Sequence, residues 1–223
     1  DYSTLSRRSA TDLVPPLVHA RSGPIHLVID STGLKMLGDG EWLAHRHRTS
    51  NKRRSWRKLH LGVAAGGFIV ASDLTDSSAD DATVGVAMLE GLQLPIGRFT
   101  ADGAYDTRAI YEVLAPAVGA SGPTIVVPPN RTAARSRPAE DVFKQRDAAI
   151  GRISEVGRRQ WRKESGAHQQ ARAENAMLRY KRIIGGSLRS KKRCAQVRET
   201  RLAVQVLNRM AELGMPLPPA YHR

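Results

Sequence analysis

The chain has 223 residues and a mass of 24.4 kDa, which is enough for one or two domains with a substantial hydrophobic core. Its 35 Lys and Arg residues against 21 Asp and Glu give a formal net charge of +14, so the protein attracts polyanions. The single cysteine, Cys194, excludes an internal disulfide framework, and no apolar run is long enough to span a membrane. We therefore expect a protein of a reducing compartment, the cytoplasm, with no membrane partner.

The first part of the chain predicts three strands in succession. The apolar run IHLVI at residues 25–29 indicates a buried strand that ends at Asp30, in the turn sequence DSTG. After a polar, basic loop, residues 59–64 and 68–74 alternate in hydrophobicity on either side of Gly66-Gly67, which is typical of a β-hairpin.

Helices and strands alternate in the rest of the chain. Residues 130–165 are charged and weakly patterned, so we expect an irregular insertion or short helices there. The order β-β-β-α-β-α-β-α-α indicates a mixed sheet with helices packed on it. The last helix carries the apolar stripe Leu202, Val206, Met210 and Leu213. The predicted elements are helix 82–90, strand 98–101, helix 107–114, strand 124–127, helix 168–184 and helix 195–213.

Positive charge is concentrated in two blocks. Residues 45–60 hold seven Lys and Arg and no acid, and residues 151–201 hold 15 Lys and Arg with four Glu. Two basic blocks that flank a near-neutral body suit a nucleic acid lying across one face, and a solvated surface is the alternative. Trp56 and Trp161 lie among these cations, where they either stack on bases or cover an edge of the core.

Three acids are candidates for catalysis. Asp30 and Asp102 each follow a predicted buried strand, and sites in open α/β sheets lie just beyond strand ends. An Asp at such a place is also a common turn former, and Glu174 in the middle of a helix is also explained by salt bridges to its neighbours. Three carboxylates can hold two Mg²⁺ or Mn²⁺ ions, which promote displacement at a phosphodiester. An acidic centre with a basic rim is what a nuclease-like site requires.

Four segments extend this hypothesis to a family. VIDSTGLK, RKLHLGVAAGGFIVASDLTDSSADDA, TADGAYD and AENAMLRYKRIIGGSLRS together resemble DDE transposases of the IS5 group, in order over roughly residues 1–210. The resemblance implies an α/β, RNase H-like mixed sheet of three antiparallel strands, then alternating helices and strands, with helices on both faces. It implies that Asp30, Asp102 and Glu174 are catalytic and bind the metal, two Mg²⁺ ions with Mn²⁺ as a substitute. The implied reaction cleaves transposon ends and transfers the strands into target DNA.

The resemblance also implies how the chain is divided and what it binds. Residues 1–22 are expected to be a remnant of an N-terminal DNA-binding region with its linker, residues 23–210 the catalytic domain and residues 211–223 a tail. The expected partner is double-stranded DNA, bound by a homodimer associated with the bacterial nucleoid. The residues expected to contact DNA are Arg53, Arg54, Trp56, Arg57, Lys58, Arg172, Arg179, Lys181 and Arg182.

Two positions depart from the family pattern of Tyr, two residues, Arg, three residues, Glu, six residues, Lys. Glu174 and Lys181 fit this pattern, but Ala167 and Gln170 stand at the Tyr and Arg positions. We expect weakened strand joining, with Gln170→Arg raising metal-dependent cleavage and Ala167→Tyr raising it further. Two alternatives remain: a truncated or decayed transposase that binds DNA without catalysis, and a haloacid-dehalogenase-like phosphatase, which needs a second Asp where Thr32 stands.

Overall fold

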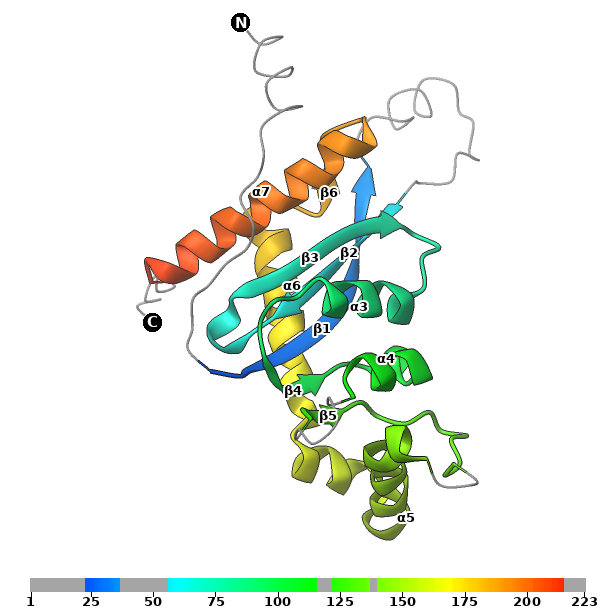
Figure 1. The fold of residues 1–223 in the computed structure, drawn as a ribbon. Helices are drawn as coiled ribbons and strands as arrows, with labels where there is room; N and C mark the ends of the chain where they lie inside the picture. The colour runs from blue at the N-terminus through cyan, green and yellow to red at the C-terminus, as the bar shows by residue number, and fades with distance from the viewer. Residues whose placement is uncertain (1–22, 37–55, 116–121, 137–139, 215–223) are drawn as a thin grey trace, which may run out of the picture.

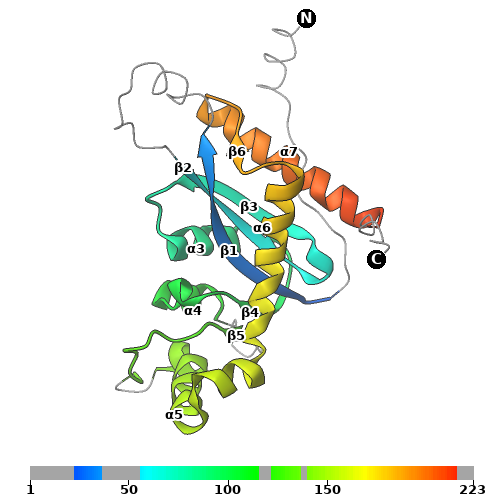
Figure 2. The same cartoon turned by 180° about the vertical axis from the view of Figure 1, so that it is seen from behind.

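A six-stranded mixed sheet forms the centre of the molecule (Figures 1 and 2). The computed structural model describes residues 23–36, 56–115, 122–136 and 140–214. The strand order is β3-β2-β1-β4-β5, with the short β6 paired to the end of β1. The strands are β1 (Ile25–Met36), β2 (Trp56–Val63), β3 (Ile69–Asp76), β4 (Ile96–Thr100), β5 (Thr124–Val126) and β6 (Ser187–Leu188).

Helices cover both faces of this sheet. The helices are α3 (Asp81–Glu90), α4 (Arg108–Val113), α5 (Lys144–Ser165), α6 (Ala171–Ile183) and α7 (Arg193–Glu212). Strands β1, β2 and β3 pair antiparallel, and β4 and β5 join parallel to β1. This is the predicted mixed α/β architecture, compatible with an RNase H-like fold. None of the helices in the described part of the chain is long and apolar enough to cross a membrane.

Side chains of β1 alternate between the two faces of the sheet and pack in two separate hydrophobic cores. Val28 and Leu34 point to one face, where they pack with apolar side chains of α6 and α7. Leu27 and Ile29 point to the other face, where they pack with side chains of α3 and α4. Successive residues of a strand face opposite sides, so a strand buried on both faces reads as a continuous apolar run. The apolar start of β1 is explained by this double burial.

The prediction that the first strand ends at Asp30 is wrong. β1 continues through Asp30 to Met36, so the sequence DSTG is extended strand and not a turn. The reason is pairing: β2 follows β1 from Val28, opposite Val63, to Lys35, opposite Trp56. The hairpin of β2 and β3 is confirmed.

The sequence predicts an irregular insertion or short helices at 130–165, and for most of this range the structure has helix and not irregular chain. α5 is a 22-residue helix, interrupted only at Gly157, whose φ of 80° and ψ of 156° are not helical. Its pattern is weak because only Gly151 and Trp161 are buried along the helix. Figure 1 shows the two halves of α5 pointing in different directions.

The apolar stripe predicted on the last helix lies on the wrong face of α7. Leu202 is 58% exposed and Val206 is 42% exposed, whereas Ala203, Val204 and Leu207 are buried. A polar contact fixes this rotation. The buried Asn208 side chain accepts a hydrogen bond from the Ile69 amide (2.9 Å) and donates one to the Ile69 carbonyl (2.8 Å). Ile69 begins the edge strand β3, so Asn208 satisfies backbone groups of the sheet edge.

We expect Asn208→Ala to lower the free energy of unfolding by about 2–4 kcal/mol, because both Ile69 backbone groups would lose their partner while buried. Urea denaturation followed by circular dichroism measures this. Asn175→Ala, at an exposed position of α6, is the matched control and should change stability by less than about 0.5 kcal/mol. Equal effects of the two substitutions would show that the Asn208 contact does not fix α7.

Candidate active site

The parallel register of β1 and β4 brings two aspartates to the same end of the sheet. The last residue pair between these strands is Val28 with Thr100. Two residues further along each chain stand Asp30 and Asp102. β4 ends at Thr100 whereas β1 continues, so the chains separate at this point. Asp102 therefore follows a strand end as predicted, and Asp30 lies beside it on the longer strand.

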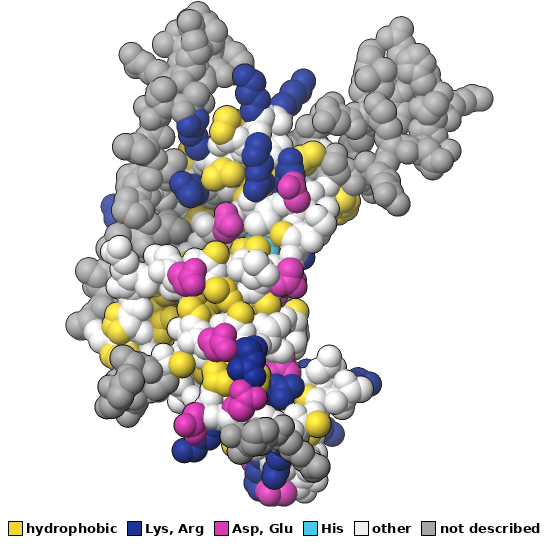
Figure 3. Space-filling view, turned by 45° about the vertical axis from the view of Figure 1, so that its right-hand side comes forward, with side chains coloured by type: hydrophobic (Ala, Val, Ile, Leu, Met, Phe, Trp, Pro, Cys, Tyr) yellow, Lys and Arg dark blue, Asp and Glu magenta, His cyan; other side chains and the backbone are white. Residues whose placement is uncertain are grey.

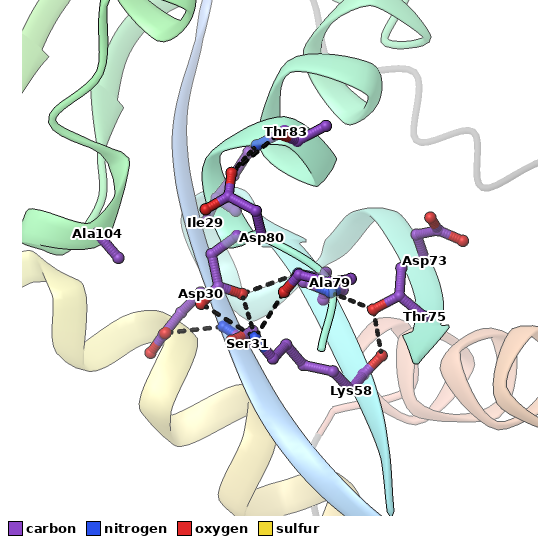
Figure 4. A network of polar contacts seen from close by, with 12 residues as sticks. Ile29, Asp30, Ser31, Lys58, Asp73, Thr75, Ala79, Asp80, Thr83 and Ala104 are labelled. Carbon is purple, nitrogen blue, oxygen red and sulfur yellow. Dashed lines mark hydrogen bonds and ion pairs between the residues drawn. The ribbon is translucent and has the colours of Figure 1, made fainter. Parts of the chain in front are cut away.

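The helix α6 brings the third acid to the same place. Gln170, just before α6, donates a hydrogen bond from Nε2 to the Ile29 carbonyl (3.2 Å). Lys181, near the end of α6, donates from Nζ to Thr32 Oγ1 (2.6 Å). These contacts fall on either side of Asp30 along β1, and Glu174 lies between Gln170 and Lys181 on the same side of the helix. The α6 helix passes β1 at the level of Asp30 (Figure 4).

The three carboxylates lie close enough for the charges of Asp102 and Glu174 to act on Asp30. Burial raises the pKa of Asp30 above its ordinary value, and repulsion from Asp102 and Glu174 raises it further. Hydrogen bonds from the Ser31 amide (2.7 Å) and from the Gln170 side chain act in the opposite direction. The pKa of the buried Tyr105 hydroxyl is raised by burial and by nearby acids that include Asp30 and Asp102.

This carboxylate set suits a hard divalent cation. As the side chains lie, Asp102 accepts a hydrogen bond from the Ala104 amide (2.9 Å), and no group of three His, Cys, Asp or Glu within the described ranges is arranged to hold a metal ion. Asp102 and Glu174 are exposed and can turn toward Asp30. Carboxylate oxygens are the ligands that Mg²⁺ prefers, and a cation between these acids would relieve the repulsion that raises the pKa of Asp30.

A cavity of about 780 Å³ opens beside these acids. Asp102, Gln170 and Glu174 line one part of it. Gln170 connects the cavity to Asp30, because its side chain also hydrogen-bonds the Asp30 carboxylate. The basic residues that line the cavity are Arg131, Arg158, Arg162, Lys163 and His168. Acidic and basic groups therefore face the same open space.

Some predicted DNA contacts are exposed on the surface. Lys181 and Arg182 are exposed on α6. Trp56 is 39% exposed, and the Lys35 ammonium lies 5.8 Å from the centre of its ring. Arg53 and Arg54 lie outside the described residues. Trp161 is buried, which decides between its two interpretations in favour of the core.

Other predicted DNA contacts have partners within the fold. Arg57 pairs with Asp76, and Lys58 donates to the Ala79 carbonyl (2.9 Å) beside the start of α3 (Figure 4). Arg179 donates to the Gly67 carbonyl (2.7 Å). Arg172 contacts His26 Nδ1 (3.3 Å), and burial together with the nearby Arg172 and Arg98 lowers the pKa of His26 to about 4. These four cations hold elements together, so their charge is less available to DNA.

The cations of α5 that line the cavity lie in the basic block 151–201 but are not among the individual residues expected to contact DNA. Arg158 and Arg162 are four residues apart and therefore share a helix face, which is the signal that a helical assignment of 144–165 would have exposed. Charge is also separated on the surface. On the face shown in Figure 3, Lys and Arg gather toward the α7 end, Asp and Glu lie across the middle, and both kinds mix at the lower end.

Comparison with protein families gives two overlapping matches. A family model described as Transposase DDE domain matches residues 21–209. A second model with the same description matches residues 1–39. No solved structure matches the chain.

The packing around position 167 leads us to a different expectation from the sequence alone. Ala167 is 9% exposed and packs in a small core with Val126 and Trp161. A Tyr would have to displace these neighbours, so we expect Ala167→Tyr to destabilise the protein by about 1–3 kcal/mol and not to raise activity. Chemical denaturation measures this, with Ala171→Tyr at an exposed position as the control. Wild-type stability of Ala167→Tyr would contradict the packing described here.

The raised pKa of Asp30 predicts a pH-dependent stability. Ionisation costs the folded state more than the unfolded chain, so stability falls as the pH rises through the raised pKa. Without divalent cations, Asp30→Asn should therefore unfold at higher urea concentration than wild type at pH 7. The difference should vanish below the ordinary Asp pKa of 3.8. Glu90→Gln, at the exposed end of α3, should show no such gain. If the Asp30→Asn protein is less stable than wild type at every pH, burial and repulsion do not destabilise the Asp30 carboxylate as described.

Proposed function

The chain belongs to the family of transposase DDE domains, and on that premise we propose that it cuts DNA at transposon ends and joins the freed strands to target DNA. The observation that carries the proposal is geometric: Asp30 and Asp102 stand two residues beyond the last pair of β1 and β4, and the contacts of Gln170 and Lys181 hold α6, with Glu174, against β1 at this point. These three acids are the proposed catalytic residues. Membership of the family leaves the phosphatase alternative without support.

Each of these residues has a chemical task in the proposed reaction. Asp30, Asp102 and Glu174 would hold two divalent cations, Mg²⁺ or Mn²⁺. Such cations activate an attacking oxygen and stabilise the leaving oxygen of a phosphodiester. In the first step water attacks the phosphodiester and the 3′-oxygen leaves as a hydroxyl; in the second step this 3′-hydroxyl attacks a phosphodiester of target DNA, whose own 3′-oxygen leaves. Both steps are in-line displacements at phosphorus.

Neighbouring side chains position the acids and the DNA. Gln170 orients Asp30, because its side chain bonds both the Asp30 carboxylate and the preceding Ile29 carbonyl. Lys181 of α6 bonds Thr32, which stands two residues after Asp30 on β1. Its ammonium therefore lies near the acids, where it would bind a DNA phosphate. Assignment to the IS5 group, action as a homodimer and association with the bacterial nucleoid belong to the same proposal and rest on the motif resemblance.

One observation favours a second candidate, DNA binding without catalysis. Gln170 stands where the family pattern has Arg; it is neutral and already engaged with β1. A charge-assisted contact to the phosphate at that position is therefore absent, and such contacts are worth about 1.5–3 kcal/mol. The two candidates differ only in whether phosphodiester bonds break.

Nicking of supercoiled plasmid in Mg²⁺ or Mn²⁺ separates them. We expect wild type to nick, and Asp102→Asn and Glu174→Gln to lose at least about 100-fold in rate, since each removes a metal ligand. Binding to duplex DNA in the absence of metal should persist in both variants, because removing an acid from a basic surface does not weaken phosphate attraction.

Glu90→Gln is the control for this experiment and should nick at the wild-type rate. Full activity of Glu174→Gln would show that the third acid is misassigned. Failure of folded wild type to nick under any divalent cation, with DNA binding intact, would favour the non-catalytic candidate.

A further inference from the structure

Three exposed cations line the cavity beside the acids: Arg131, Arg162 and Lys163. Within the described part of the chain, none of their side chains makes a hydrogen bond or ion pair, whereas the side chain of Arg158, in the same lining, bonds the Pro129 carbonyl. The acids of α5 have other partners: Glu155 and Glu164 both pair with Arg152, and Asp147 accepts a hydrogen bond from the Ser136 amide (3.1 Å). Positive charge at the cavity is therefore not neutralised by the helix that carries it.

The half of α5 that carries these cations is held firmly in place. Trp161 is buried against Val126 of β5. The Arg98 guanidinium of β4 donates to the Ser165 carbonyl at the end of the helix. Arg158 donates to the Pro129 carbonyl (2.8 Å) in the segment after β5. Gly157 interrupts the helix with a positive φ, so the segment from Arg158 to Ser165 takes its own direction. Arg162 is thus presented to the cavity by a braced element.

These cations face Asp102 and Glu174 across one space. A free anion would be repelled by the acids, and a free cation by Arg162 and Lys163. A DNA strand suits both sides, because its phosphates can pair with Arg and Lys while the scissile phosphodiester lies at the carboxylates. The planar guanidinium of Arg162 can bind a phosphate through two parallel hydrogen bonds.

We propose that Arg162, with Lys163 and Arg131, forms a phosphate cradle that binds the DNA backbone next to the carboxylates and supplies the positive charge that Gln170 cannot. The proposal rests on the proposed function for the identity of the ligand. It assigns to α5 a positioning role in DNA engagement, distinct from the role of Lys181 on α6.

The cradle is tested by binding of a fluorescent 30-base-pair duplex, measured by anisotropy without metal over a salt series. Arg162→Gln combined with Lys163→Gln should weaken binding about three- to tenfold at about 100 mM salt. It should also reduce the slope of log affinity against log salt by about 1–2, one for each lost phosphate contact. Arg159→Gln is the matched control for Arg162→Gln alone, because each removes one cation: Arg159 is exposed on the same helix but does not line the cavity.

A second measurement places the effect in the cavity. Gln170→Arg added to Arg162→Gln should restore most of the lost affinity, because it returns a cation to the same space. Gln160→Arg adds the same charge to α5 outside the cavity and should restore little. Equal rescue by both substitutions would overturn the cradle.

The outcomes separate the cradle from catalysis. If Arg162→Gln and Arg159→Gln change affinity and salt slope equally, the cradle is refuted even where wild type nicks plasmid. If Arg162→Gln is selectively impaired while wild type never nicks, the cradle stands and the catalytic function fails.

Discussion

The parallel pairing of β1 with β4 is the contact on which the candidate site depends. The pairing ends at Val28 and Thr100, and an aspartate follows two residues later on each chain. β1 stays extended beyond this point because β2 pairs with it along its length. β4 is backed by β5, through the Thr100–Val126 pair and the bond from the Ala101 amide to the Val126 carbonyl (3.3 Å). The candidate site thus lies where β4 ends and β1 continues.

Gathering acids at this point opposes stability, and hydrogen bonds from the Ser31 amide and the Gln170 side chain limit that cost. Repulsion and burial both raise the pKa of Asp30. The ammonium of Lys181 stands close by through its bond to Thr32, and the cations of α5 face the acids across the cavity. A metal ion would neutralise the acidic centre, and DNA would neutralise the basic residues around it. This arrangement is consistent with a protein of net charge +14.

Local patterns in the sequence were enough for much of the fold. The alternation around Gly66-Gly67 predicts the hairpin, and the helix predicted at 82–90 is found as α3, with Asp80 as its N-cap and Gly91 as its C-cap. What failed depended on long-range contacts. The length of β1 is set by pairing with β2, and the rotation of α7 by the bond of Asn208 to the edge of β3.

The candidate site shows the same division. Asp30, Asp102 and Glu174 come from motifs, and the structure adds their coupling. The role of each Arg could not be read from charge alone: Arg172 and Arg179 are used to hold His26 and Gly67, whereas Arg162 faces a cavity. These arginines carry the same charge and differ in the groups that they contact, which the sequence alone does not show.

Anomalous diffraction from crystals grown with Mn²⁺ and a short DNA duplex tests the central claim most directly. The account predicts manganese bound by carboxylate oxygens of Asp30, Asp102 and Glu174, at about 2.0–2.2 Å, with a DNA phosphate beside it. Manganese bound elsewhere, or DNA seated with these three side chains apart and metal-free, would contradict it.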